Sequence, residues 1–200
     1  MGNTFFRNTC RSTLPSTFFI TQQRWLVTTL LTIACLSSGC PRMLHLNYQP
    51  SNSLKGNGTV QVGPFLYASP PTGLIKQNAV EGNPHDVEAL YLSQDIGKVF
   101  TDAVTKELAF SGYNVQPGEA RIVSGTIEQF FLEYVGGAEQ RFELLATFTV
   151  TRTDKANFTS TCRSNLKEPK DWMKSGSLIE RGMKDCIEQF IKGAQAAGVL

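Results

Sequence analysis

The chain has 200 residues, 41% of them hydrophobic and 18% charged, and its formal net charge at pH 7 is +2. This length suits one domain with a single hydrophobic core. Without residues 1–39, which contain three arginines and no acidic residue, the balance changes from 19 basic against 17 acidic residues to 16 against 17. Such a near-neutral balance, with no clustered basic face, argues against nucleic-acid binding.

The N-terminal region contains an apolar run at residues 25–35, after Arg7, Arg11 and Arg24 and before Leu36-Ser37-Ser38-Gly39-Cys40. As a helix, these eleven residues would span about 16–17 Å, roughly half of a bilayer's hydrocarbon core. That length is typical of a signal peptide. The order of charged segment, apolar segment, small residues and cysteine resembles the signal peptide and lipobox of a bacterial lipoprotein. The resemblance implies that residues 1–39 are removed and that Cys40 becomes the acylated first residue.

Two neighbouring residues bear on this interpretation. Ser37 stands three positions before the cysteine, where a lipobox most often has leucine. Pro41 follows the cysteine, where an aspartate would resemble an inner-membrane retention signal of enteric bacteria. We therefore expect a lipid-anchored protein of the bacterial envelope, in the outer membrane and facing the periplasm. An ordinary cleaved signal peptide and a short core helix are the alternatives.

Residues 40–58 predict a lipidated N-terminus followed by a tether, because they are rich in Asn, Ser, Gly and Pro. Fully extended, such a tether would reach at most roughly 60 Å from the bilayer. Residues 59–200 then form the single folded domain.

The folded part begins with a strand over residues 59–67, in which apolar and polar residues alternate. One side of this strand carries Val60, Val62 and Leu66. Pro64 marks an edge or a bulge. Three further strands are predicted over residues 120–133, 140–152 and 158–166.

Two helices are predicted from apolar stripes at spacings of three and four residues. The first covers residues 94–111, with Ser93 as N-cap and Gly112 as the left-handed residue at its end. Asp102, Lys106 and Glu107 lie off its stripe and predict a solvent-exposed face. The second helix covers residues 178–194.

The predicted order is therefore β-α-β-β-β-α. A sheet with one apolar face needs cover on that face, and two amphipathic helices can provide it. We expect an α+β two-layer sandwich with about four mostly antiparallel strands and both helices packed on one face.

A family resemblance follows from several segments taken together. They are the lipobox, Tyr48-Gln49-Pro50, Val62-Gly63, Gly112-Tyr113-Asn114-Val115 and Val123-Ser124-Gly125-Thr126-Ile127. This pattern resembles the YajG-type small envelope lipoproteins and, more distantly, the transport-auxiliary lipoproteins. The resemblance implies a fold and a location, not a reaction.

Cys162 and Cys186 lie on the apolar sides of the last predicted strand and the last predicted helix. If that helix packs on that strand, the two sulfur atoms can meet, and the envelope permits disulfides. The alternative is a pair of reduced cysteines that behave as small hydrophobic residues. Without a nearby histidine, the pair is a poor zinc site.

Other candidates are weaker. The segment Asn83-Pro84-His85-Asp86-Val87-Glu88 gathers possible metal ligands, but its spacing favours a solvated loop. Trp172 fits either a partner contact or packing over the end of the core. We find no catalytic or nucleotide-binding motif.

We therefore expect no enzymatic activity and no cofactor. The first functional hypothesis is a non-enzymatic, lipid-anchored module that binds an envelope protein and assists assembly or transport. The alternative is a module that binds a lipid or another small apolar ligand in a groove between helices and sheet. The residues that could line this groove are Phe130, Phe131, Phe142 and Phe148.

Overall fold

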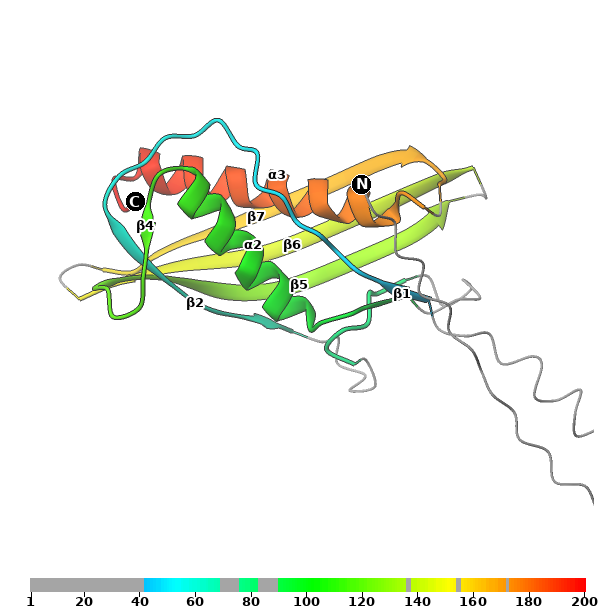
Figure 1. Ribbon diagram of the computed structural model, residues 1–200, viewed down its shortest axis with the longest axis horizontal. Helices are drawn as coiled ribbons and strands as arrows, with labels where there is room; N and C mark the ends of the chain where they lie inside the picture. Colours follow the sequence, from blue (N-terminus) through cyan, green and yellow to red (C-terminus); the bar gives the residue numbers. More distant parts are fainter. Residues whose placement is uncertain (1–41, 69–75, 83–89, 136–137, 154–155, 172) are drawn as a thin grey trace, which may run out of the picture. The chain divides into compact units, whose positions relative to one another are not determined.

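The computed structural model describes residues 42–200 except 69–75, 83–89, 136–137, 154–155 and 172. Helices and strands together confirm the predicted α+β class (Figure 1). In chain order the elements are β1 (Arg42–Leu44), β2 (Thr59–Tyr67), β3 (Leu90–Leu92), α2 (Ile96–Phe110), β4 (Asn114–Val115), β5 (Arg121–Val135), β6 (Glu139–Arg152), β7 (Phe158–Pro169) and α3 (Ser175–Ala196).

Within the described residues, the main sheet has five strands in the spatial order β4-β2-β5-β6-β7. β2 is parallel to β4 and β5, whereas β5, β6 and β7 are antiparallel neighbours. β1 and β3 form a separate parallel pair. The predicted count of about four strands and the order β-α-β-β-β-α are therefore wrong. The missed strands β1, β3 and β4 have three, three and two residues, too few to show alternation.

The two helices lie on one face of the main sheet (Figure 1). α2 packs mainly on β2, and α3 packs on β6 and β7. The side chains between these layers include five fully buried phenylalanines. At their centre, Phe148 stacks on Phe190 with ring centroids 4.2 Å apart and meets Phe65 edge to face at 5.1 Å. Each such pair contributes about 0.5–1.5 kcal/mol beyond the area that it buries.

The alternation in β6 is confirmed, because every second side chain points into the core. The buried set is Phe142, Leu144, Ala146, Phe148 and Val150, each at most 1% exposed. Thr147 and Thr149 lie on the opposite face and are half-buried. This face points away from the helices.

The prediction of which β2 side chains share one face is correct at the start of the strand and wrong at its end. The pairing of β2 with β5 shifts register between Val62 and Phe65, which confirms a bulge at Pro64. Beyond the shift, Phe65 and Tyr67 are buried, and Leu66 is 66% exposed. A bulge reverses the sidedness of the residues that follow it.

The helices differ slightly from their predicted bounds. α2 begins at Ile96, with Asp95 rather than Ser93 at the N-cap, and Asp95 makes no side-chain capping bond. Gly112 has a φ of 97°, as expected for the left-handed residue after a helix. α3 is longer than predicted and extends from Ser175 to Ala196.

Candidate functional site

The predicted lipidation site, Cys40, lies outside the described residues, which begin two positions later at Arg42. The first described residues are held in the fold by backbone hydrogen bonds. Arg42 begins β1, which pairs with β3, and the Ser93 amide donates to the Leu44 carbonyl at 2.9 Å. Since two residues span at most about 7 Å, the Cα of Cys40 must lie within that distance of the Cα of Arg42.

The segment predicted as a tether contacts the helices along its described part. We call residues 45–57 the strap; it crosses the helical layer between β1 and β2 (Figure 1). The Asn47 amide donates to Glu180 at 2.8 Å, and Lys184 Nζ donates to the Ser51 carbonyl at 3.1 Å. Gln195 Nε2 donates to the Lys55 carbonyl at 3.1 Å. α3 thus contacts the strap at three points along its length.

The strap also contacts α2 through Glu107, whose carboxylate is fully buried. The Tyr48 hydroxyl donates to Glu107 Oε1 at 2.7 Å, and Asn52 Nδ2 donates to Glu107 Oε2. Ser111 Oγ lies 3.0 Å from Asn52 Oδ1 and can donate to it. A buried carboxylate is tolerated only where such donors replace its hydration. The four side chains Glu107, Tyr48, Asn52 and Ser111 form the cluster that we call the Glu107 network.

The environment of Tyr48 opposes its ionisation. Burial raises the pKa of Tyr48 far above its ordinary value, and the hydrogen bond to Glu107 raises this pKa further. Tyr48 therefore stays a neutral donor. The predicted solvent exposure of Glu107 is wrong, because the strap covers this part of α2. Asp102 stays exposed and pairs with Lys98, while Lys106 Nζ donates to the Tyr48 carbonyl at 3.0 Å.

Cys162 and Cys186 meet between β7 and α3. Both are buried, and their Cα atoms are 5.2 Å apart with the sulfur atoms joined as a disulfide pair. This Cα separation lies within the usual range for a disulfide. The oxidation of this pair in the cell remains a prediction.

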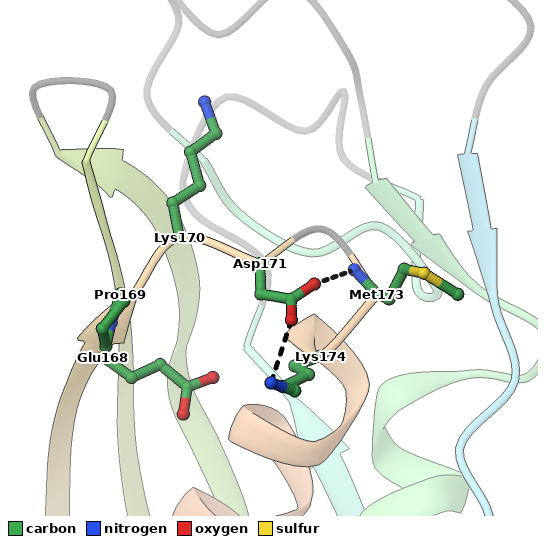
Figure 2. Close-up of a pocket in the computed structure, with 6 residues that line it drawn as sticks. All are labelled: Glu168, Pro169, Lys170, Asp171, Met173 and Lys174. Carbon is green, nitrogen blue, oxygen red and sulfur yellow. Dashed lines mark hydrogen bonds and ion pairs between the residues drawn. The ribbon is translucent and has the colours of Figure 1, made fainter.

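An open depression of about 410 Å³ lies where β7 leads into α3 (Figure 2). Its lining is Glu168, Pro169, Lys170, Asp171, Met173 and Lys174. Asp171 accepts from the Met173 amide at 3.0 Å and pairs with Lys174 Nζ at 3.1 Å. These interactions, the one with Lys174 first, lower the pKa of Asp171. Met173 itself is 93% exposed.

Several sequence candidates receive no structural test. The segment 83–88 and Trp172 lie outside the described residues. Across the part of the chain that is described, no group of three or more His, Cys, Asp or Glu side chains is placed to hold a metal ion. In the same part, neither helix has the length and apolar character needed to cross a bilayer.

Three of the four phenylalanines that could line an apolar groove are buried in the core instead. Phe130 and Phe142 meet edge to face at 5.0 Å, and both are fully buried, as is Phe148. Phe131 is only half-buried. The three buried rings fill the space between sheet and helices.

Comparison with known proteins identifies solved structures with a similar fold. No family model matches the chain, and no curated protein matches it. A solved structure from Xanthomonas campestris, of the DUF330 family, has a TM-score of 0.57 at 13% identity and covers 78% of this chain and 96% of its own. A second, described as an uncharacterized protein, has a TM-score of 0.55 at 11% identity and covers 77% of this chain and 99% of its own. At these identities the likeness shows a shared fold.

Bacterial lipoproteins are also found among the more distant structures. Rare lipoprotein B from Shewanella oneidensis has a TM-score of 0.41 at 9% identity and covers 72% of this chain and 97% of its own. That score is too low to support an inference about function.

Proposed function

We propose that this chain is a lipid-anchored lipoprotein of the bacterial envelope that acts without enzymatic activity as a binding, assembly or transport-auxiliary module. The observation that supports it is the leader over residues 1–39, directly before Cys40, and the folded domain that begins two residues after that cysteine. A thiol at the first residue of the mature chain can carry a diacylglyceryl group as a thioether. Each buried CH₂ of an acyl chain contributes about 0.8 kcal/mol, so two or three chains anchor a protein firmly.

The absence of an aspartate after Cys40 supports an outer-membrane location, with the domain facing the periplasm. The surface that we assign to a protein partner is the sheet face opposite the helices. Thr147 and Thr149 lie on this face in β6, and Thr159 and Thr161 are exposed on the neighbouring strand β7. A polar, hydrogen-bonding sheet face suits a partner protein better than an apolar ligand.

Metabolic labelling with an alkyne analogue of palmitate tests the anchor. We expect the wild-type chain and Cys35→Ser to label and to fractionate with membranes. Cys40→Ser should lose both properties, because the acyl-accepting thiol is gone. Cys35→Ser is the matched control, since Cys35 lies in the segment that is removed. Continued labelling of Cys40→Ser contradicts the anchor.

Site-specific photo-crosslinking in intact cells tests the partner surface. A crosslinker at Thr159, on the sheet face, should give a discrete protein adduct. The same crosslinker at Lys192, which is exposed on α3, should not give that adduct. Identical adducts from both positions contradict the assignment of the sheet face.

A further inference from the structure

Two connections of the domain, between β5 and β6 and between β7 and α3, meet at the end of the domain where the described chain begins. The Tyr134 hydroxyl, near the end of β5, lies 3.3 Å from Ser175 Oγ at the start of α3. The Lys170 amide donates to the Ala138 carbonyl, in the connection between β5 and β6, at 2.9 Å. We call the surface formed by β1, residues 134–135, 138–139, 169–171 and 173–176 the β1 end (Figure 1).

The strap is anchored on the same end. A Cβ atom added to Gly176, in the first turn of α3, would lie 3.5 Å from Leu46 Cδ2. The Leu46 side chain, two residues after β1, therefore lies over the first turn of α3. If Cys40 is acylated, only the two peptide units between Cys40 and Arg42 separate the lipid from this end, a span of about 7 Å at most.

The contacts of the strap determine how far the 18 residues before β2 let the domain move from the bilayer. Were residues 41–58 free, they would allow the domain to move up to roughly 60 Å from the bilayer. The Glu107 network and the contacts of α3 with Asn47, Ser51 and Lys55 remove this freedom. The β1 end must then stay next to the anchor.

The β1 end also carries exposed apolar side chains. Met173 is 93% exposed, Met43 is 55% exposed and Val135 is 40% exposed. They are three of the five large hydrophobic side chains that are exposed among the described residues. Figure 2 shows the Met173 side chain pointing away from Asp171 and from the body of α3. Methionine is flexible and polarisable, and it adapts to irregular apolar surroundings.

Polar groups that suit a headgroup layer lie near Met173 on the same end. Lys170 Nζ lies 4.9 Å from the centroid of the Tyr134 ring, and Lys174 is exposed beside Asp171. Tyrosine and lysine side chains are common where proteins meet the bilayer interface. Lysines near the surface also attract anionic lipids.

We propose that the β1 end rests on the bilayer, with Met173 and Met43 in contact with lipid. This proposal rests on the acylation of Cys40 that the proposed function requires. It adds a fixed orientation: α3 extends away from the membrane, so that the end of the domain near Asn57 is farthest from it. α3 has 22 residues, which separates the two ends by about 33 Å.

Fluorescence quenching on vesicles tests this orientation. The acylated full-length product is reconstituted into vesicles of phosphatidylethanolamine and phosphatidylglycerol that contain brominated phospholipid. A fluorophore is attached through Met173→Cys or, as matched control, through Asn57→Cys, at an exposed position that precedes β2. We expect strong quenching at position 173 and several-fold weaker quenching at position 57.

Flotation of the same samples separates the two proposals. If the protein floats with the vesicles and position 173 is not quenched more than position 57, the orientation is wrong and the anchor stands. If it does not float, and its N-terminal peptide carries no lipid, the proposed function is wrong and the orientation is wrong with it. A photo-crosslinker at position 173 that captures a protein instead of lipid in intact cells also overturns the orientation.

Discussion

Glu107 is the residue on which the position of the strap most depends. Its carboxylate receives hydrogen bonds from Tyr48 and Asn52, which precede it by 59 and 55 positions in the chain. The charge of Glu107 favours exposure, which is why the sequence predicts a solvent-exposed side chain. Its position, three residues after Val104 and seven after Phe100, is nevertheless in line with the buried face of α2. Helical spacing is therefore consistent with burial, whereas the hydrogen-bond donors come from an irregular segment that periodicity does not locate.

The Glu107 network predicts the effect of Asn52→Ala. The change removes one donor to a buried carboxylate and should lower the free energy of unfolding by about 1–3 kcal/mol. Chemical denaturation measures this loss, and amide hydrogen exchange should speed up in residues 45–57. Asn57→Ala, at an exposed strap position, is the control and should change little. Equal effects of the two substitutions would show that the network does not hold the strap.

Tyr48 predicts a dependence of stability on alkaline pH. Burial raises the pKa of Tyr48 and of Tyr67 in the folded chain, whereas in the unfolded chain both ionise near pH 10.0. The stabilisation is complete below pH 10 and declines above it, because the unfolded state then binds fewer protons. Each tyrosine should contribute a slope of up to about 1.4 kcal/mol per pH unit.

Tyr48→Phe isolates the contribution of one tyrosine. The free energy of unfolding, measured by denaturation between pH 9 and pH 11, should fall less steeply in the variant by up to about 1.4 kcal/mol per pH unit. Unchanged steepness would mean that Tyr48 ionises in the folded state. Tyr67→Phe should reduce the slope in the same way, since Tyr67 donates to Glu81.

At the scale of elements, β7 and α3 are joined by the Cys162–Cys186 pair. The bridged residues are 24 positions apart, and closure of such a loop stabilises a fold by roughly 3 kcal/mol in the chain-entropy model. We expect both thiols to resist alkylation in denaturant until a reductant is added. Cys186→Ala should expose one alkylatable thiol at Cys162 and lower the unfolding free energy by a similar amount. Alkylation of both cysteines without reductant would mean that they are two reduced core residues.

The contact of α2 with β2 requires a residue without a side chain. A Cβ atom at Gly97 would overlap the Phe65 carbonyl oxygen, whereas at Gly193, on α3, the nearest atom would be 3.9 Å away. Gly97→Ala should therefore lower the unfolding free energy by about 1–3 kcal/mol. Gly193→Ala should raise it by about 0.5–1 kcal/mol, because alanine favours a helix. Thermal denaturation distinguishes the two, and a tolerated Gly97→Ala would contradict the close packing of α2.

The elements differ in how far the sequence predicts them. The alternation of β6 and the stripes of the two helices repeat over many residues, so their presence and buried faces are predictable. β1, β3 and β4 are too short for a pattern, and the bulge in β2 reverses the side of Leu66. The mixed sheet arises because β2 lies between β4 and β5 and is parallel to both, an arrangement that local periodicity does not specify.

In the whole molecule, the leader and the strap together determine where the domain lies relative to the membrane. The leader predicts lipid on Cys40, and the strap holds the β1 end within a few residues of that lipid. The segment expected as a tether is, where the structure describes it, part of the folded domain. The sheet face assigned to a partner protein then has a defined position relative to the membrane.

The N-terminal peptide of the protein extracted from membranes provides the most direct measurement. Trypsin cleaves after Arg42, so mass spectrometry should detect Cys40-Pro41-Arg42 with a diacylglyceryl group on the sulfur atom. No peptide from residues 1–39 should accompany it. A membrane-extracted chain that still begins before Cys40, or that has an unmodified Cys40 thiol, would contradict the account.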